Sequence, residues 1–519
     1  MKRTLYLVHR WLGIILCLFM AMWFFSGVVM MYVGYPKLTP SERLAALPAL
    51  DASRCCAALP GILAAAARTE NPKGVRLTSV GGAPRAVLSY GRSGVVAVDA
   101  VSARRIDAVS AADALAAAQA FMPGARASYE ALVAEDAWTH SKAMDPHRPL
   151  HRIRMADAQA TVLYVSGQTG EVVRDATGTE RVWNWVGAWI HWLYPLRGGM
   201  ADRYWTDIVI YTSIAATVLA LLGMVVGVWR WRFAGRFSSG SHSPYREPWM
   251  RWHHLLGLVF GVMTAAFIFS GLMSMNPFRV LDSGAPKLEQ RMTAHDRWQA
   301  RHFVLSAPQA LERFAASGFA ARELEWRMVD GAGYFLALDG QGRSRLLAAG
   351  SASEDAQPFE AFSMAQMQAL GSALFAKNKV IEATVLTEYD TYYYNREPHT
   401  MGGGVKRLPV LRLKFDDAQA SWLHLDPGRG AVISQLDSHG RVRRWLFAFL
   451  HSWDWLPLLE RRPLWDLWML ALSVGGFIIS ATGTVLGWRR LQRKKSGRAA
   501  AGRACASMES PSGPHWGKL

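Results

Sequence analysis

Four histidines occur at equivalent places in the two halves of this chain. His9 and His253 stand at the start of a long apolar run, 244 residues apart (253 − 9 = 244). His191 and His451 each come shortly before a later apolar run, 260 residues apart (451 − 191 = 260). Imidazole nitrogens are good ligands for iron. If the two halves bring these residues together, each pair can offer two imidazoles to one iron from opposite sides.

Four charge-free apolar segments must position these histidines. Each is 22 or 23 residues long, and they are Trp11–Val33, Ile208–Trp229, Leu255–Pro277 and Leu467–Trp488. An α-helix needs about 20 residues to cross a hydrocarbon core of about 30 Å, and a backbone in lipid must satisfy its own hydrogen bonds. We therefore predict four transmembrane α-helices. The first apolar run exceeds the roughly 7–15 residues of a signal peptide, so we expect it to be retained.

The net charge of +18 is concentrated beside these segments. Lys2, Arg3 and Arg10 precede the first one, the loop between the second and third carries a net +4, and the chain from Arg489 onward a net +7. Positive residues gather on the cytoplasmic side of membrane proteins. We therefore expect a multi-pass protein of the bacterial inner (plasma) membrane with both termini in the cytoplasm. This bias explains the basic composition without nucleic-acid binding.

The remaining chain reads as two extracytoplasmic domains. Residues near 57–67 and 111–121 indicate amphipathic helices, and residues 86–90, 95–98, 151–155 and 160–165 indicate strands, the last followed by a glycine turn and a return strand. The expected fold is a membrane protein with four transmembrane α-helices in two parallel pseudo-repeats and two α+β extracytoplasmic domains. The predicted order is N-terminus and first helix 1–33, first periplasmic domain 34–180, interfacial histidine segment and second helix 181–232, basic cytoplasmic loop 233–251, third helix 252–278, second periplasmic domain 279–440, histidine segment and fourth helix 441–490, and basic cytoplasmic tail 491–519.

The two offsets describe an internal duplication. The 244-residue offset carries Ser26-Gly27 onto Ser270-Gly271, and the 260-residue offset runs from Tyr129, matched with Tyr389, to Gly227, matched with Gly487. The second half should therefore contain a net gain of 16 residues before Tyr389 (260 − 244 = 16). A duplication that includes membrane helices implies a pseudo-twofold axis, here along the membrane normal because both halves start in the cytoplasm.

Three of these features resemble the PepSY-associated transmembrane proteins. They are the string His9-Arg10-Trp11-Leu12-Gly13, the turn Thr169-Gly170-Glu171-Val172-Val173 with its counterpart Asp426-Pro427-Gly428-Arg429-Gly430, and the segment from Trp445 to Leu450-His451. The resemblance extends to about Arg498. It implies PepSY-like extracytoplasmic domains in an inner-membrane protein. Many members are iron-regulated, and some are siderophore reductases that bind haem, so the resemblance also implies iron uptake by reduction of ferric siderophore.

The histidine pairs suit haem chemistry. Two axial histidines hold haem iron six-coordinate, which favours electron transfer over oxygen binding. We expect His9 and His253 to bind one haem b near the cytoplasmic face, and His191 and His451 to bind a second near the outer face. The sequence has no Cys-x-x-Cys-His, so the haem would be held by coordination alone. The alternative is that each is an ordinary interfacial histidine, which the duplication then copied.

Charged residues beside the histidines are further candidates for cofactor binding. Arg10 can pair with a haem propionate, since guanidinium binds carboxylates bidentately, or can simply be a positive flank of the helix. The same two interpretations apply to Arg181 and Arg441, the second being a solvated face. His254 has no histidine counterpart in the first half, because Arg10 stands there, and is an alternative ligand or propionate partner.

Other small and polar residues are assigned to packing. Small residues let helices approach closely, and they include Ser26-Gly27, Ser270-Gly271, Gly223, Gly227, Gly483 and Gly487. Two clusters outside the membrane, at 139–154 and 389–394, contain imidazole, carboxylate and phenol groups that can bind ferric iron. Such residues more often pack on strands and in loops.

The favoured hypothesis is a transmembrane dihaem protein that passes electrons to ferric siderophore in the periplasm. No catalytic residue is assigned. The chain lacks a Gly-x-Gly-x-x-Gly nucleotide motif, so the electron donor is expected to be a quinol or a separate flavoprotein. The alternative is a haem-free PepSY membrane protein that binds or regulates partner proteins such as peptidases. A transporter is disfavoured, because the apolar segments lack the buried carboxylates and broken helices of coupling sites.

Overall fold

The chain divides into two compact units. The computed structural model describes residues 2–197, 200–295, 298–350, 356–402 and 404–508, so residues 509–519 of the predicted tail lie outside the described residues. The helical unit comprises Met1–Val29, Val186–Val280 and Arg443–Leu519. The β-sheet unit comprises Met30–Trp185 and Leu281–Val442.

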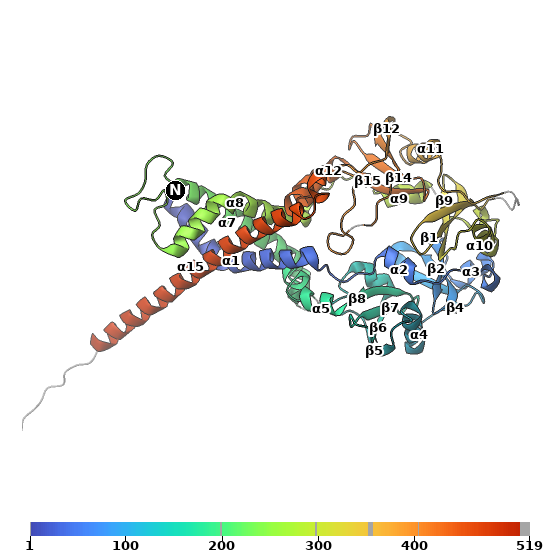
Figure 1. The fold of residues 1–519 in the computed structure, drawn as a ribbon, viewed down its shortest axis with the longest axis horizontal. Helices are drawn as coiled ribbons and strands as arrows, with labels where there is room; N and C mark the ends of the chain where they lie inside the picture. The colour runs from blue at the N-terminus through green and yellow to red at the C-terminus, as the bar shows by residue number, and fades with distance from the viewer. Residues whose placement is uncertain (1, 198–199, 296–297, 351–355, 403, 509–519) are drawn as a thin grey trace, which may run out of the picture. The chain divides into compact units, whose positions relative to one another are not determined.

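Four long helices form the helical unit, and they confirm the predicted membrane helices. They are α1 (Lys2–Tyr32), α7 (Trp205–Arg230), α8 (Pro248–Ser274) and α15 (Leu464–Met508). Each contains a stretch long and apolar enough to cross a membrane. Helix α8 packs against both α7 and α15 (Figure 1). The helices start earlier than the apolar runs, since polar residues at the membrane boundary still continue the helix. His9 therefore lies within α1.

Short segments precede α7 and α15, and the two repeats build them alike. The first has α6 (Ala188–His191), η4 (Tyr194–Leu196) and η5 (Asp202–Tyr204), and the second has the π-helix η8 (Arg444–Phe449), α13 (Leu450–Ser452) and α14 (Leu456–Leu459). Leu193 and Trp453 both adopt positive φ, at 52° and 48°, and end the helical turn that carries the histidine. The Trp205 and Trp465 indoles then donate to main-chain carbonyls of Trp192 and Ser452, at 2.7 and 2.9 Å.

The β-sheet unit contains three antiparallel sheets. The largest has seven strands in the order β11 (Ser344–Ala348), β10 (Ala332–Leu338), β9 (Glu323–Val329), β1 (Gly74–Val80), β2 (Ala83–Ser89), β3 (Val95–Asp99) and β4 (Arg105–Ile106). Strands β1 and β9 pair with Val75 opposite Trp326 and Leu77 opposite Leu324. The two repeats therefore share this sheet, an arrangement that the sequence analysis did not predict.

Each repeat also contributes a four-stranded meander with a helix against it, which confirms the α+β class. The first is β5 (Ala127–Val133), β6 (Leu150–Met155), β7 (Val162–Ser166) and β8 (Val172–Ala176) with α4 (Ala111–Phe121). The second is β12 (Val380–Leu386), β13 (Val410–Phe415), β14 (Trp422–Asp426) and β15 (Ala431–Leu436) with α11 (Met364–Leu374). Ile153 and Leu163 lie fully buried in the first core, as do Leu413 and Leu423 in the second.

Smaller helices complete the described structure. They are α2 (Pro40–Ala46), α3 (Leu59–Ala65), α5 (Gly178–Asn184), α9 (Leu288–His295), α10 (Ala307–Ala316) and α12 (Ser438–Arg443), with 3-10 turns η1 (Ala52–Arg54), η2 (Gly91–Ser93), η3 (Lys142–His147), η6 (Pro277–Arg279) and η7 (Ala300–His302). Helices α2, α4, α5, α10 and α11 each begin with a capping box, which satisfies otherwise unpaired backbone N–H groups.

The structure corrects the position of the 16-residue gain. The first residues of β1 and β9 are 249 positions apart, those of β5 and β12 are 253 apart, and those of β6 and β13 are 260 apart. The gain is thus spread over three places, and the last seven residues enter between β12 and β13. Tyr129 lies in β5, whereas Tyr389 follows β12. The predicted match of these two tyrosines is therefore wrong, because it ignored the longer loop.

Candidate functional site

The imidazoles of His9 on α1 and His253 on α8 face one another within the helical unit. Their ring centroids are 6.5 Å apart. His9 Nδ1 lies 3.2 Å from the carbonyl oxygen of Leu219 on α7, and His253 Nδ1 lies 3.1 Å from that of Ile479 on α15. Leu219 and Ile479 are themselves 260 residues apart, so both contacts follow the repeat. We call these two histidines the His9 pair.

The second pair has the same arrangement with different partners. His191 and His451 have ring centroids 6.2 Å apart. His191 Nδ1 lies 3.1 Å from Ser26 Oγ on α1, and His451 Nδ1 lies 3.1 Å from Ser270 Oγ on α8. We call them the His191 pair. Each pair therefore combines one histidine from each repeat.

The hydrogen bonds assign one tautomer to all four rings. A carbonyl oxygen only accepts, so Nδ1 of His9 and His253 must carry the proton. The Ser26 and Ser270 hydroxyls donate to the carbonyls of Trp23 and Phe267, at 3.1 and 2.8 Å, so their oxygens accept from the histidines. Ligation would then use Nε2 in every ring. Metal-binding histidines characteristically donate their other ring N–H in this way.

The separation of the rings also fits a shared iron. A metal–imidazole bond is about 2 Å long, and a ring nitrogen lies about 1 Å from its ring centroid. Two axial imidazoles therefore place their centroids about 6 Å apart. The observed 6.5 and 6.2 Å agree with this value.

Glycines lie against the rings of both pairs. A Cβ at Gly223 would lie 2.8 Å from His9 Cε1, and one at Gly483 would lie 3.3 Å from His253 Cε1. Gly27 and Gly271 contact His191 and His451 more loosely; the corresponding distances are 3.5 and 3.7 Å. The interpretation of these four glycines as helix-packing contacts is therefore wrong, because their neighbours are the imidazoles.

The packing interpretation holds for the other two glycines. A Cβ at Gly227 would meet Leu258 of α8 at 3.3 Å, and one at Gly487 would meet Ile14 of α1 at 3.3 Å. These glycines let neighbouring helices approach closely.

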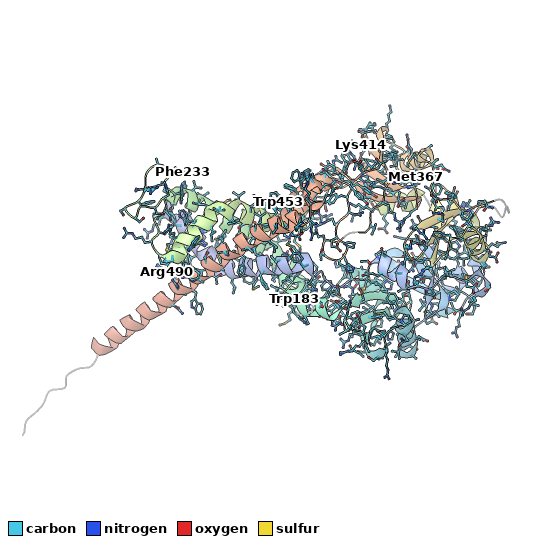
Figure 2. The ribbon with its side chains drawn as sticks, viewed as in Figure 1. Trp183, Phe233, Met367, Lys414, Trp453 and Arg490 are labelled. Carbon is cyan, nitrogen blue, oxygen red and sulfur yellow. A yellow bond between two sulfur atoms is a disulfide. The ribbon has the colours of Figure 1, made fainter. Side chains whose placement is uncertain are left out.

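The two pairs lie near opposite ends of the bundle. His9 and Ser26 are 17 residues apart on α1, which corresponds to about 26 Å along the helix. A hydrocarbon core is about 30 Å thick. Phe233, just after α7, and Trp453, just after α13, mark the two ends of the helical unit in Figure 2. A centre at each pair would therefore lie near each face of a membrane.

The neighbouring residues behave differently from the pairs. His254 is buried and uses both ring nitrogens, Nδ1 with Ser243 Oγ at 2.8 Å and Nε2 with the Gly227 carbonyl at 2.9 Å. It is His253 that faces His9. Arg10 is exposed on α1. The predicted roles of Arg10 and His254 in cofactor binding stay predictions.

Arg181 and Arg441 bind main-chain carbonyls within the β-sheet unit. The first donates to Ala176 and Ala160, and the second to Ala420 and Leu436. These bonds hold the ends of strands, which favours a structural role for both arginines.

The extracytoplasmic histidines are likewise engaged in local structure. His151 Nε2 contacts the Val109 carbonyl at 3.0 Å, and His147 Nδ1 contacts Ser166 Oγ at 3.1 Å. Among the residues that the structure describes, no three His, Cys, Asp or Glu side chains gather as a metal site.

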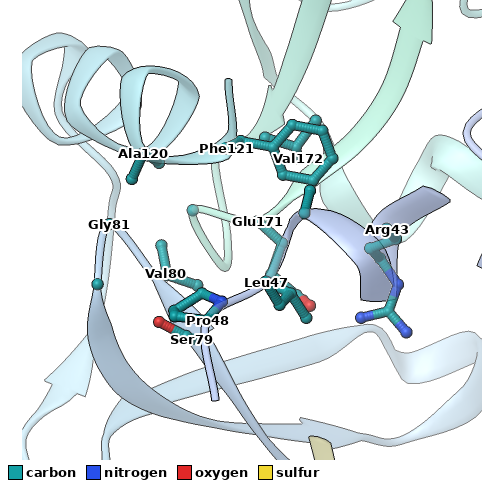
Figure 3. Close-up of a pocket in the computed structure, with 14 residues that line it drawn as sticks. Arg43, Leu47, Pro48, Ser79, Val80, Gly81, Ala120, Phe121, Glu171 and Val172 are labelled. Atoms are coloured by element: carbon teal, nitrogen blue, oxygen red, sulfur yellow. The ribbon is translucent and has the colours of Figure 1, made fainter. Parts of the chain in front are cut away.

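A pocket in the β-sheet unit adjoins a buried ion-pair network (Figure 3). Arg43 donates to both carboxylate oxygens of Glu323, at 2.5 and 2.8 Å, and Arg76 contacts both Glu323 and Glu171. Burial favours the neutral acid, but Arg76 and Arg43 outweigh it and lower the pKa of Glu171 to about 2. The cavity is about 30 Å³, the volume of one water molecule, so we assign it no cofactor.

Sequence reasoning missed the partners of the histidines. Ser26 and Ser270 stand out only through their shared 244-residue offset, which had suggested packing. The Leu219 and Ile479 carbonyls leave no signal in the side-chain sequence, because every residue has a carbonyl.

Comparison with known proteins identifies a family. A family model described as the PepSY-associated TM region matches residues 6–374, well over half of the chain. The match includes His9, His191 and His253. No curated protein matches the chain.

Proposed function

The chain belongs to the PepSY-associated TM region family, and from this membership and the histidine geometry we propose that it binds two haem b groups and carries electrons across the bacterial inner membrane. The observation that carries the proposal is the repeated arrangement of the histidines. Both pairs have centroid distances that suit one iron, and all four rings have Nδ1 engaged.

The residues present fit this cofactor. His9 and His253 would hold one haem, and His191 and His451 the other, each through Nε2. Haem iron with two axial imidazoles exchanges one electron while it keeps both ligands. Between the pairs, the bundle is lined by buried apolar side chains that exclude water, among them Leu16, Met20, Phe24 and Ile268.

The proposed direction is from the cytoplasm to the periplasm, with ferric siderophore as the acceptor. Positive charges beside α1, α7 and α15 support cytoplasmic placement of the His9 pair. The family membership supports a role in iron uptake. Siderophores favour ferric iron, so its reduction to Fe(II) would release the metal. The donor is proposed to be a quinol or a reduced flavoprotein. On this view the chain is a ferric-siderophore reductase.

A reduced-minus-oxidised visible spectrum with a pyridine haemochrome count tests the cofactor. We expect two b-type haems per chain of detergent-purified protein, and one in His9→Ala or His191→Ala. His242→Ala is the matched control, because His242 lies exposed in the loop after α7 and its Nδ1 binds the Arg232 carbonyl. That variant should keep both haems. A colourless protein after expression with ample haem would contradict the proposal and support the haem-free partner-binding alternative.

Electron transfer is tested in sealed proteoliposomes with known protein orientation. A quinol supplied with the protein should reduce a ferric siderophore added on the β-sheet-unit side, and an Fe(II) chelator should report the product. His9→Ala should abolish this transfer. Reduction at the wild-type rate by His9→Ala would contradict the proposed route.

A further inference from the structure

The two histidine pairs use different kinds of hydrogen-bond acceptor at Nδ1. In the His9 pair both acceptors include main-chain carbonyls, of Leu219 and Ile479. In the His191 pair both rings bind a serine hydroxyl, of Ser26 and Ser270, each at 3.1 Å. A side-chain acceptor can be removed by substitution, whereas a main-chain acceptor cannot. This difference allows the acceptor's role to be isolated at one end of the bundle.

The serines can act only as acceptors toward the histidines. Both side chains are fully buried at 0% exposure. Each hydroxyl proton is committed to the carbonyl three residues earlier, that of Trp23 for Ser26 and that of Phe267 for Ser270. The oxygen lone pair therefore receives the Nδ1 proton of the histidine. This bond fixes the ring about its own axis and directs Nε2 away from the serine.

An acceptor at Nδ1 also changes the donor strength of Nε2. When Nδ1–H donates a hydrogen bond, electron density shifts toward Nε2 and the ligand becomes more basic. A more basic axial ligand stabilises ferric iron relative to ferrous iron and so lowers the reduction potential. Loss of the acceptor should have the opposite effect.

We propose that Ser26 and Ser270 are positioning residues that set the reduction potential of iron held by the His191 pair, independently of the His9 pair. The proposal rests on the proposed haem function. It adds a specific role for two residues that do not touch the iron and act through His191 and His451. The 244-residue offset between the serines means that both ligands of one centre are adjusted in the same way.

The test is a spectroelectrochemical titration of the purified full-length chain. Ser26→Ala and Ser270→Ala should each move one of the two couples to a more positive potential and leave the other unchanged. We expect a three- to tenfold change in the ratio of reduced to oxidised iron at a given potential, where tenfold corresponds to 59 mV for a one-electron couple. His451→Ala identifies the couples, since only the centre at the His9 pair should remain.

Ser274→Ala is the matched control. Ser274 lies one turn beyond Ser270 on α8, and its hydroxyl donates to the Gly271 carbonyl at 2.6 Å. This variant should keep both potentials. Ser26→Thr retains a hydroxyl and should stay close to the wild-type values, which separates loss of the acceptor from disturbed packing.

The possible outcomes separate the two proposals. Absence of haem from the wild-type chain would overturn the proposed function. Two haems with unchanged potentials in both serine-to-alanine variants would overturn the role of the serines alone. A shift of both couples together, or an equal shift in Ser274→Ala, would also overturn it, because the effect would then be general. A positive shift confined to the His191 pair and reversed in Ser26→Thr would support it.

Discussion

Gly223 on α7 lies so close to His9 on α1 that a Cβ at position 223 would be 2.8 Å from His9 Cε1. Contact at this distance requires the imidazole to move. The Leu219 carbonyl that binds His9 Nδ1 lies one turn earlier on the same helix. Helix α7 thus both orients the ring and leaves room for it.

Substitution Gly223→Ala should therefore displace His9. We expect the haem count to fall toward one per chain and the free energy of unfolding to fall by about 1–3 kcal/mol, the usual cost of overpacking. Pyridine haemochrome counts and thermal unfolding in detergent measure the two effects. Gly257→Ala is the control, because a Cβ there meets nothing within 4 Å. Equal behaviour of the two variants would contradict the assigned contact.

Double substitutions should reveal which histidines share a centre. His9→Ala with His253→Ala removes both ligands of one pair, so the doubly substituted chain should retain one haem. His9→Ala with His191→Ala removes a ligand from each pair, so that chain should retain none. The measurement is again the haem count. The opposite result would mean that the pairs form along each repeat instead of between repeats.

The buried carboxylate of Glu323 should be essential to the β-sheet unit. Its side chain is 1% exposed and binds both Arg43 and Arg76. Substitution Glu323→Ala leaves two arginines with no shared partner, and we expect a loss of about 3–5 kcal/mol in the free energy of unfolding. Denaturant unfolding followed by tryptophan fluorescence measures it. The control is Glu382→Ala, whose exposed pair with Lys414 should contribute at most about 1 kcal/mol. Similar losses would show that the network is not stabilising.

Asp175 on β8 should make stability depend on pH. Burial, with the nearby charges of Glu42 and Glu180, raises its pKa to about 7. The folded chain then binds the proton more tightly than the unfolded chain, so this contribution is largest below about pH 4 and is lost as pH rises through 7. In contrast, burial and Arg412 lower the pKa of His424 to about 3, which decreases stability as pH falls below about 6.5.

Substitution Asp175→Asn isolates the first effect. The difference in unfolding free energy between the variant and the wild type should grow in favour of the variant by about 1–2 kcal/mol from pH 5 to pH 8, after allowance for partial exposure. His424 contributes equally to both chains and cancels. Thermal unfolding at the two pH values provides the measurement. A difference that does not change with pH would show that Asp175 titrates normally.

The sequence by itself determined the membrane helices, the α+β class and the histidine pairs. Hydrophobic length is a property of consecutive residues, so α1, α7, α8 and α15 could be located from it directly. The offsets of 244 and 260 residues carried the repeat, and the repeat paired His9 with His253 and His191 with His451. The structure places both pairs face to face, while haem binding stays a prediction.

Only the tertiary structure decided how the histidines are held and how the β-sheet unit is joined. The partners of His9 and His253 are main-chain carbonyls on helices more than 200 residues away in the sequence. The pairing of β1 with β9 depends on edges that meet only after both repeats have folded. Such contacts depend on the distance between segments in space. Side-chain types and spacing along the chain do not encode that distance directly.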